Sequence, residues 1–163
     1  MAHHAVKKTN AMRELDRAGI VYKLHCYEVD ENHISGVDVA EQLGENPMQV
    51  FKTLVCVANT HEYVACCVPV GNELNLKAAA RAAGAKSLSM LPLSELLSVT
   101  GYIRGGCSPI GMKHAMLTLI DCSCQRFDTI FVSAGKRGYQ LELSPQDLVR
   151  FCQAQLAAIS AEE

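Results

Sequence analysis

The chain has 163 residues, and its 15 basic and 17 acidic side chains give a formal net charge of −2. This length suits one domain with a packed core over residues 1–163. The balanced charge argues against binding of DNA through bulk positive charge, although a local basic patch would suffice for RNA. No apolar run reaches the roughly 20 residues that a membrane helix needs. We expect a single domain whose ends, residues 1–8 and 160–163, are flexible.

Eight cysteines occur in the chain, most of them inside apolar runs such as residues 64–68. Reduced cysteine packs as a small hydrophobic residue, and the N-terminus lacks an apolar signal segment. We therefore expect reduced thiols and a cytoplasmic location. Cys66 and Cys67 are adjacent, and one residue separates Cys122 from Cys124, so the spacing of a zinc site is missing. The sequence predicts no structural metal.

The N-terminal part of the chain predicts a helix, a strand and a second helix. Thr9 or Asn10 can cap a short helix that stops at Gly19. Residues 20–28 alternate with a period of two, which is typical of a strand. The second helix, with its apolar side chains facing inward, ends at Gly44.

Two apolar runs in the middle of the chain predict a hairpin. Residues 49–58 and 62–70 are rich in β-branched side chains and are separated by the turn residues 59–61. Lys52 is the one charged residue inside the first run. Its side chain either lies on the solvent face, with its stem over apolar surface, or points into a pocket. The residues alone favour the solvent-facing alternative.

Short elements follow this hairpin. Asn75 caps an alanine-rich helix over residues 76–83, residues 86–90 suit a short strand, and Pro92 opens another helix. The next apolar run, residues 115–120, is a further expected strand.

The C-terminal part predicts a second hairpin and a last helix. Residues 129–133 and 139–143 flank a basic, glycine-containing turn. Ser144, with proline in the first turn, marks the start of the last helix. We expect that helix to carry one apolar stripe, formed by Leu148, Phe151, Cys152, Gln155 and Ile159.

The order of these elements favours an α+β domain. Strands occur in separated antiparallel pairs with helices between them, so we expect a mixed, largely antiparallel, twisted or barrel-like sheet surrounded by helices. A doubly wound parallel sheet is the weaker alternative, because two hairpin signals indicate antiparallel pairing.

Residues 100–111 form the most unusual segment of the chain. Four glycines and a proline within twelve residues exclude a regular helix or a central strand, so this segment is a shaped loop. Such a loop can bring backbone N–H groups close to a carbonyl oxygen or a developing oxyanion, although it can also be only a structural turn. Cys107 invites the role of a nucleophile, and His114 that of a general base. No obvious Cys/His pair supports either role.

Four segments together resemble the YbaK/EbsC family of free-standing aminoacyl-tRNA deacylases, which are related to the editing domain of bacterial prolyl-tRNA synthetases. They are residues 51–55 (FKTLV), 101–102 (GY), 105–111 (GGCSPIG) and 132–138 (VSAGKRG). The resemblance covers nearly the whole chain and is strongest to the YbaK type, which removes cysteine mischarged on proline tRNA. It implies that family's editing-domain fold and no metal or organic cofactor.

The resemblance also implies site residues. Lys52 would be catalytic, with its ammonium on the terminal phosphate or ribose of the tRNA, which reverses the solvent-facing preference. Gly105 would be catalytic through its backbone, as the first residue of a G-x-x-x-P loop that holds the scissile carbonyl. The remaining implied residues line the aminoacyl pocket: Tyr27, Thr53, Gly106, Cys107, Ser108, Pro109, Ser133 and Gln140. Gln140 departs from the aspartate usual in YbaK-type sequences, which puts a carboxylate's role in orienting the substrate ammonium in doubt.

The implied reaction needs no protein nucleophile. The substrate's cysteine thiol attacks its own ester, displaces the ribose hydroxyl and leaves a cyclic thioester that water opens. The implied partners are the 3′ end of Cys-tRNA(Pro) and, plausibly, prolyl-tRNA synthetase. Two alternatives stay open: a deacylase for another small amino acid that uses water as the nucleophile, and a non-catalytic module that binds a synthetase or tRNA.

Overall fold

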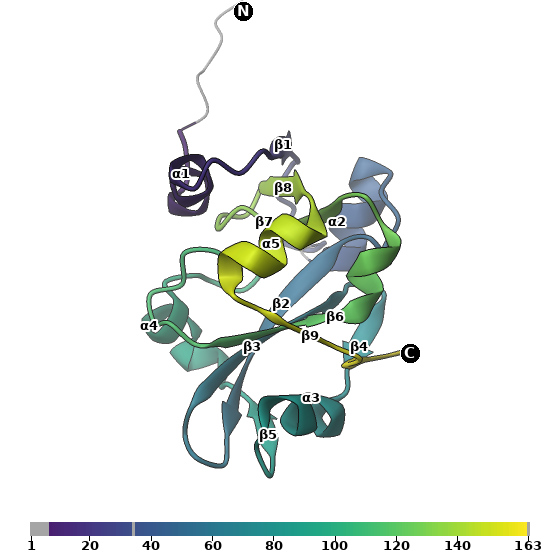
Figure 1. The fold of residues 1–163 in the computed structure, drawn as a ribbon. Helices are drawn as coiled ribbons and strands as arrows, with labels where there is room; N and C mark the ends of the chain where they lie inside the picture. Colours follow the sequence, from purple (N-terminus) through teal and green to yellow (C-terminus); the bar gives the residue numbers. More distant parts are fainter. Residues whose placement is uncertain (1–6, 34, 163) are drawn as a thin grey trace, which may run out of the picture.

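The computed structural model describes residues 7–33 and 35–162, and its strands form three sheets (Figure 1). The largest sheet has the order β5-β2-β3-β6-β9, the second β1-β8-β7, and the third pairs β10 with β4. The strands of the largest sheet are β2 (Phe51–Ala58), β3 (Tyr63–Pro69), β5 (Leu88–Met90), β6 (Leu117–Asp121) and β9 (Gln155–Ala157). The others are β1 (Lys23–Cys26), β4 (Asn72–Leu74), β7 (Ile130–Ser133), β8 (Tyr139–Leu143) and β10 (Ser160–Glu162).

Four of the five helices begin at capping residues that the sequence indicates, whereas the helix predicted to open at Pro92 starts as a 3₁₀ turn and becomes α-helical only at Leu96. The helices are α1 (Asn10–Arg17), α2 (Gly36–Leu43), α3 (Leu76–Ala83), α4 (Leu96–Thr100) and α5 (Pro145–Cys152), with 3₁₀ turns η1 (Leu93–Glu95) and η2 (Cys122–Arg126). The side chains of Thr9, Ser35, Asn75 and Ser144 each accept a hydrogen bond from a backbone N–H of the first turn. Among the described residues, every helix is too short or too polar to cross a lipid bilayer.

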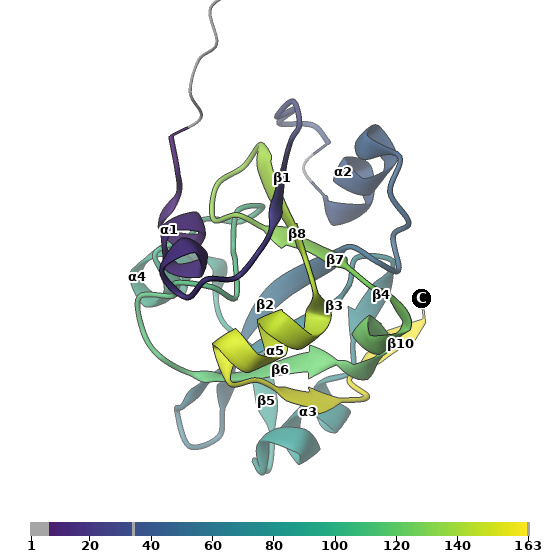
Figure 2. The ribbon, with the colours of Figure 1, turned by 45° about the horizontal axis from the view of Figure 1, so that its top comes forward.

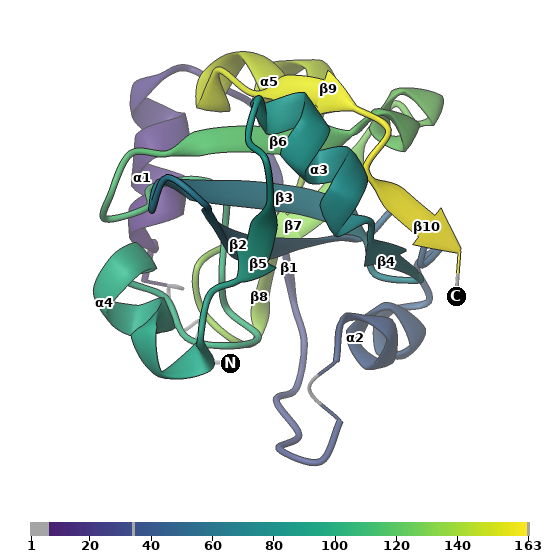
Figure 3. The same cartoon turned by 90° about the horizontal axis from the view of Figure 1, so that it is seen from below.

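The five-stranded sheet is covered on both faces. Figures 1 and 2 show α5 and the β1-β8-β7 sheet on one face, and Figure 3 shows α3 across the other. Adjacent residues of β3 point to opposite faces: Cys67 packs with Leu141 and Leu148, whereas Cys66 packs with Ala79 of α3. The long apolar runs in the sequence therefore reflect strands that are buried on both sides.

The predicted α+β class with a mixed, largely antiparallel sheet is confirmed. The pairs β2–β3, β2–β5, β1–β8, β7–β8 and β4–β10 are antiparallel, whereas β3–β6 and β6–β9 are parallel. These last two pairs supply the parallel part of the mixed sheet. An isolated bridge between Val50 and Phe131 joins the two larger sheets, and within the described residues no sheet closes into a barrel.

The first strand is shorter than the alternation of residues 20–28 predicts. The backbone N–H of Ile20 donates to the carbonyl of Leu15 at 3.0 Å, so residue 20 belongs to the turn that closes the first helix. The pairing of β1 with β8 starts at Lys23, which lies opposite Glu142. β8 ends at the next residue, Leu143, and Ser144 already caps α5, so residues 20 and 21 have no strand residue of β8 opposite them.

The C-terminal predictions were wrong in two respects. Helix α5 ends at Cys152, because Gln153 adopts a left-handed conformation with φ of 50°, so Gln155 and Ile159 do not belong to a helical stripe. Residues 160–162 are not loose but form β10. At the other end, Lys8 pairs with Asp16, whereas residues 1–6 and 163 lie outside the described residues.

The carboxylate of Asp121 holds the C-terminal segment in place. It is 3% exposed, and its Oδ1 accepts from the N–H groups of Ile159 at 2.9 Å and Ser160 at 3.0 Å. Its Oδ2 accepts from the N–H of Ser123 at 3.2 Å. Asp121, at the end of β6, thus accepts hydrogen bonds both from the turn that follows it and from the C-terminal segment.

Replacing Asp121 with alanine should lower the free energy of unfolding by roughly 2–4 kcal/mol, because it leaves buried N–H groups without acceptors. Urea unfolding measures the loss, and hydrogen exchange at Ser160 should accelerate. Asp128→Ala, at an exposed position, is the matched control and should change stability by less than about 0.5 kcal/mol. A similarly small change for Asp121→Ala would contradict this role.

Candidate functional site

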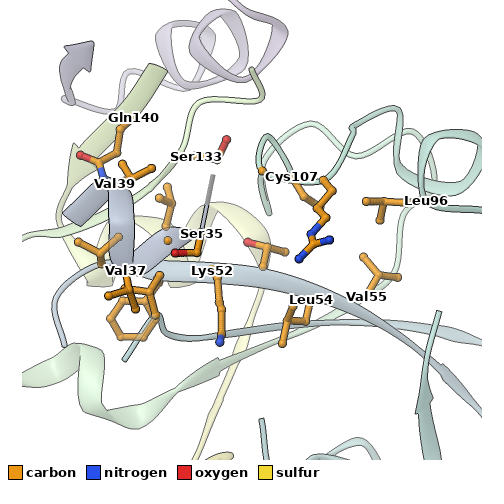
Figure 4. A pocket seen from close by; sticks show the side chains of 18 of the residues that line it. Ser35, Val37, Val39, Lys52, Leu54, Val55, Leu96, Cys107, Ser133 and Gln140 are labelled. Atoms are coloured by element: carbon orange, nitrogen blue, oxygen red, sulfur yellow. The ribbon is translucent and has the colours of Figure 1, made fainter. Parts of the chain in front are cut away.

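A pocket of about 700 Å³ lies where the two larger sheets, α2 and the glycine-rich loop meet (Figure 4). Its floor is β2, residues 50–55, and its walls come from residues 35–39 of α2, residues 132–140 of β7 and β8, and residues 90–107 around α4. These segments are far apart in the sequence, so the pocket exists only in the folded chain.

Seven of the ten predicted site residues line this pocket. They are Tyr27, Lys52, Thr53, Gly105, Cys107, Ser133 and Gln140. Gly106, Ser108 and Pro109 do not line the pocket, and all three are buried. The Ser108 hydroxyl accepts from the N–H of Ile110 at 3.2 Å, so it shapes the loop. His114 is exposed and does not line the pocket.

The loop is held from within by Tyr102. Its buried hydroxyl donates to the carbonyl of Ile110, so this hydrogen bond joins the beginning of the loop to its end. The hydroxyl of Thr100 donates to the carbonyl of Leu96 at 2.7 Å and accepts from the N–H of Tyr102 at 3.0 Å, which ties the loop to α4. The loop is therefore a rigid part of the pocket wall.

The loop also packs directly on the basic turn between β7 and β8. Gly105 has φ of +86°, and a Cβ there would lie 3.1 Å from Nε of Arg137. That Nε donates to the carbonyl of Arg104 at 2.7 Å. A Cβ on Gly106 would lie 3.2 Å from the backbone nitrogen of Arg137. Glycine suits position 105 because of its positive φ, and position 106 because the backbone of residues 136 and 137 lies so close to it.

Three pocket-lining residues of the loop have backbone N–H groups without a hydrogen bond. Among the described residues, no hydrogen bond engages the N–H of Arg104, Gly105 or Cys107, whereas the N–H of Gly106 donates to the carbonyl of Ile103 at 2.9 Å. Gly105 and Cys107 both line the pocket. Free N–H groups at a pocket wall can stabilise the negative charge that develops on a carbonyl oxygen under attack.

Lys52 supplies a half-buried cation at the floor of the pocket. Figure 4 shows the side chains of Lys52 and Leu54 extending from the same side of β2, away from Ser133 and Gln140. No described carboxylate forms an ion pair with Lys52. An ammonium without an acidic partner can bind a phosphate group. The Lys52 side chain points away from the part of the pocket that contains Gln140.

Cys107 lacks the properties of a nucleophile. Burial raises the pKa of its thiol to about 12, so the reactive thiolate is scarce at neutral pH. Cys107 packs instead beside the apolar cluster of Val55, Leu91 and Val99. Its side chain therefore serves as part of the pocket wall.

We expect Cys107→Ala to keep kcat/KM for the reaction of this pocket within about threefold, because a buried protonated thiol supplies only packing. The purified protein should also resist alkylation of Cys107 by iodoacetamide at pH 8, as measured by peptide mass spectrometry, while the exposed Cys26 reacts. A loss of about a hundredfold in the variant would restore the nucleophile hypothesis.

Several lining residues were missed from the sequence. Arg104 and Ser35 are the polar ones, and Val37, Val39, Leu91, Leu93 and Leu96 are apolar. Arg104 precedes Gly105 in the loop, and that adjacency was a usable signal for a second cation. Ser35 was visible only as the start of a helix, and its side chain accepts from the N–H of Asp38 at 3.1 Å.

Comparisons with known proteins found a matching family model and similar sequences. A family model for the aminoacyl-tRNA editing domain matches residues 31–151. A protein of Enterococcus faecalis (strain ATCC 700802 / V583), with the provisional name Cys-tRNA(Pro)/Cys-tRNA(Cys) deacylase EbsC, is 44% identical over 157 residues. The matched segment is 96% of this chain and 96% of that relative.

Two solved structures have the same fold. Hypothetical protein APE2540 superposes with a TM-score of 0.83 at 22% identity, covering 91% of this chain and 97% of that one. A protein provisionally described as a trans-editing enzyme for prolyl-tRNA synthetase has a TM-score of 0.80 at 21% identity, covering 95% of this chain and 99% of that one. At these identities the likeness establishes the fold alone.

Proposed function

The chain belongs to the aminoacyl-tRNA editing domain family, as the resemblance to YbaK/EbsC proteins predicted, and we propose that it hydrolyses the ester of Cys-tRNA(Pro). The observation that carries this proposal is the pair of free N–H groups, at Gly105 and Cys107, in the wall of a pocket of about 700 Å³. Such a pair suits an ester carbonyl, and the small apolar surroundings suit a short side chain. Hydrolysis of Cys-tRNA(Cys) is the second expected activity.

The proposed reaction uses the substrate's own thiol. The cysteine sulfur attacks the ester carbonyl, and the N–H groups of Gly105 and Cys107 stabilise the oxyanion. The ester C–O bond then breaks, the ribose oxygen takes up the thiol proton, and the cysteine remains as a cyclic thioester that water opens. The protein holds sulfur and carbonyl close together. It needs no nucleophile of its own, in keeping with the raised pKa of Cys107.

The proposed contact with the phosphates of the tRNA is electrostatic. Lys52 and Arg104 are the cations of the lining, and both can bind phosphates of the tRNA 3′ end. With a net charge of −2, the protein should bind tRNA weakly and with strong salt dependence. Prolyl-tRNA synthetase is the proposed partner that selects the tRNA, and we place the activity in the cytoplasm, where eight free cysteines stay reduced.

The test is deacylation of tRNA(Pro) carrying cysteine, alanine, serine or S-methylcysteine, with and without prolyl-tRNA synthetase. Rapid loss of cysteine alone supports the thiol-assisted reaction, because S-methylcysteine keeps the size but lacks the nucleophile. Comparable loss of alanine or serine would replace it with attack by water. No loss from any of the four tRNAs in either condition would overturn the proposal and favour a binding module.

A further inference from the structure

The side chain of Arg137 contacts the backbone of the glycine-rich loop. Its Nε donates to the carbonyl of Arg104 at 2.7 Å, and its Cγ and Cδ would lie 3.6 and 3.7 Å from a Cβ on Gly105. The Arg137 side chain is 24% exposed, so most of its surface is covered. Arg104 and Gly105 line the pocket, whereas Arg137 does not. The guanidinium is therefore placed to act on the loop and not directly on a ligand.

The carbonyl that Arg137 binds belongs to the same peptide unit as the N–H of Gly105. A trans peptide unit is planar, and no cis bond occurs among the described residues, so its C=O and N–H point in opposite directions. Because the C=O of this unit is directed at Arg137, its N–H is directed away from Arg137. That N–H has no hydrogen-bond partner among the described residues, and Gly105 lines the pocket. The contact with Arg137 thus fixes the direction of a free donor in the pocket wall.

The charge of the guanidinium also affects the strength of this donor. A hydrogen bond from a cation draws electron density toward the carbonyl oxygen of Arg104, and successive hydrogen-bonding groups polarise one another. The N–H at the other end of the peptide unit becomes more positive as a result. The ion pair of Arg137 with Glu31 is weaker, because Nη1 lies 3.6 Å from Oε2 and the Glu31 side chain is 80% exposed.

The basic turn between β7 and β8 holds Arg137 in this position. A Cβ on Gly106 would lie 3.2 Å from the backbone nitrogen of Arg137, so the backbones of the loop and the turn are in close contact. The N–H of Tyr27 donates to the carbonyl of Gly138 at 2.9 Å, which ties the turn to the end of β1. Arg137 therefore reaches the loop from a backbone that is itself held in place.

We propose that Arg137 is a positioning residue that aims the N–H of Gly105 at the ester carbonyl of the substrate and strengthens this N–H as a donor to the oxyanion. This inference rests on the proposed function. Donors of this kind are effective because they are oriented before the negative charge develops. A contact between Arg137 and a tRNA phosphate is the competing role. The first role requires a donor at the position of Nε, whereas the second requires a positive charge.

Two substitutions separate the donor from the charge. Arg137→Gln removes the charge but keeps an N–H donor in place, because the amide nitrogen of glutamine is bonded to Cδ, as Nε of arginine is. Arg137→Met keeps a side chain of similar length and removes both the charge and the donor. Arg126→Met, at an exposed position that does not line the pocket, is the matched control. Deacylation of Cys-tRNA(Pro) gives kcat and KM for each protein.

We expect Arg137→Met to lower kcat by about tenfold to a hundredfold, less than the loss of an oxyanion donor itself, because the N–H remains but is misdirected. The KM for tRNA should change by less than about threefold, because the donor acts in the transition state. Arg137→Gln should recover most of the lost kcat, and Arg126→Met should match the wild type. The amide signal of Gly105 in ¹H–¹⁵N spectra should move in Arg137→Met and stay near its wild-type position in Arg137→Gln.

The other outcomes overturn the inference in distinguishable ways. Equal losses in Arg137→Gln and Arg137→Met, confined to KM and joined by a salt slope for tRNA binding reduced by about one, would assign Arg137 to a phosphate. Displaced signals throughout the loop with a lower unfolding temperature would make Arg137 a purely structural residue. Unchanged kcat in Arg137→Met would also overturn the inference, while leaving the deacylase function intact. No cleavage by the wild type would refute the proposed function itself.

Discussion

Replacing Lys52 with alanine should lower kcat/KM for deacylation by about a hundredfold while leaving the fold intact, because it removes a charge-assisted contact to the tRNA 3′ end. Lys52 is half-buried on β2 and forms no ion pair with any described residue, so its loss leaves no carboxylate unpaired. Single-turnover deacylation measures the rate, and urea unfolding checks the fold.

Salt dependence gives this prediction a second readout. If the Lys52 ammonium binds a phosphate, the variant should reduce the slope of log K against log salt for tRNA binding by about one. Lys77→Ala, at an exposed position of α3 that does not line the pocket, is the matched control and should change neither rate nor slope appreciably. Normal turnover in Lys52→Ala would remove this residue from the site.

Gly105→Ala should lower the deacylation rate by about a hundredfold to a thousandfold, the range expected when an oxyanion donor is misplaced. The backbone has φ of +86° there, and the new Cβ would lie 3.1 Å from Nε of Arg137. An L side chain is strained at this φ, so the backbone should relax, and the N–H groups of Gly105 and Cys107 shift with it. The KM for tRNA should change less than kcat, because the oxyanion donors act in the transition state and Lys52 stays in place on β2.

Gly84→Ala controls for backbone strain alone. Gly84 also has positive φ, +72°, but a Cβ there would meet nothing within 4 Å, and the residue caps α3 away from the pocket. Both variants should lose about 1 kcal/mol of stability from the left-handed conformation. Only Gly105→Ala should lose activity. Equal activities of the two proteins would show that the loop N–H groups do not serve the reaction.

Local signals predicted most elements correctly. Asn75 and Gly84 bound a helix over residues 76–83, and the hairpin of β2 and β3 forms from the two predicted runs. The parallel pairs β3–β6 and β6–β9 could not be predicted this way, because their partners are distant in the sequence and no turn joins them. The C-terminal strand β10 depends on Asp121, some forty positions earlier, as its hydrogen-bond acceptor.

The site was predictable only where family motifs reach it. From the residues alone, Lys52 was expected on the solvent face, and the resemblance moved it to the pocket, which it lines. Gln140 was noticed as a departure from the family pattern, but no local pattern shows that its side chain is 3% exposed and lines the pocket. The hydrogen bond from Arg137 to the carbonyl of Arg104 likewise joins two residues that no local pattern connects.

The dispersed origin of the pocket has a consequence for synthesis on the ribosome. The β2–β3 hairpin can form as soon as it emerges, but the pocket stays incomplete until β8 has been translated, and β6 gains its second neighbour only with β9. Pairings that close such long loops are slow. A nascent chain therefore holds apolar strands such as β3 with one edge unpaired for much of its translation, and it depends on late residues for protection against aggregation.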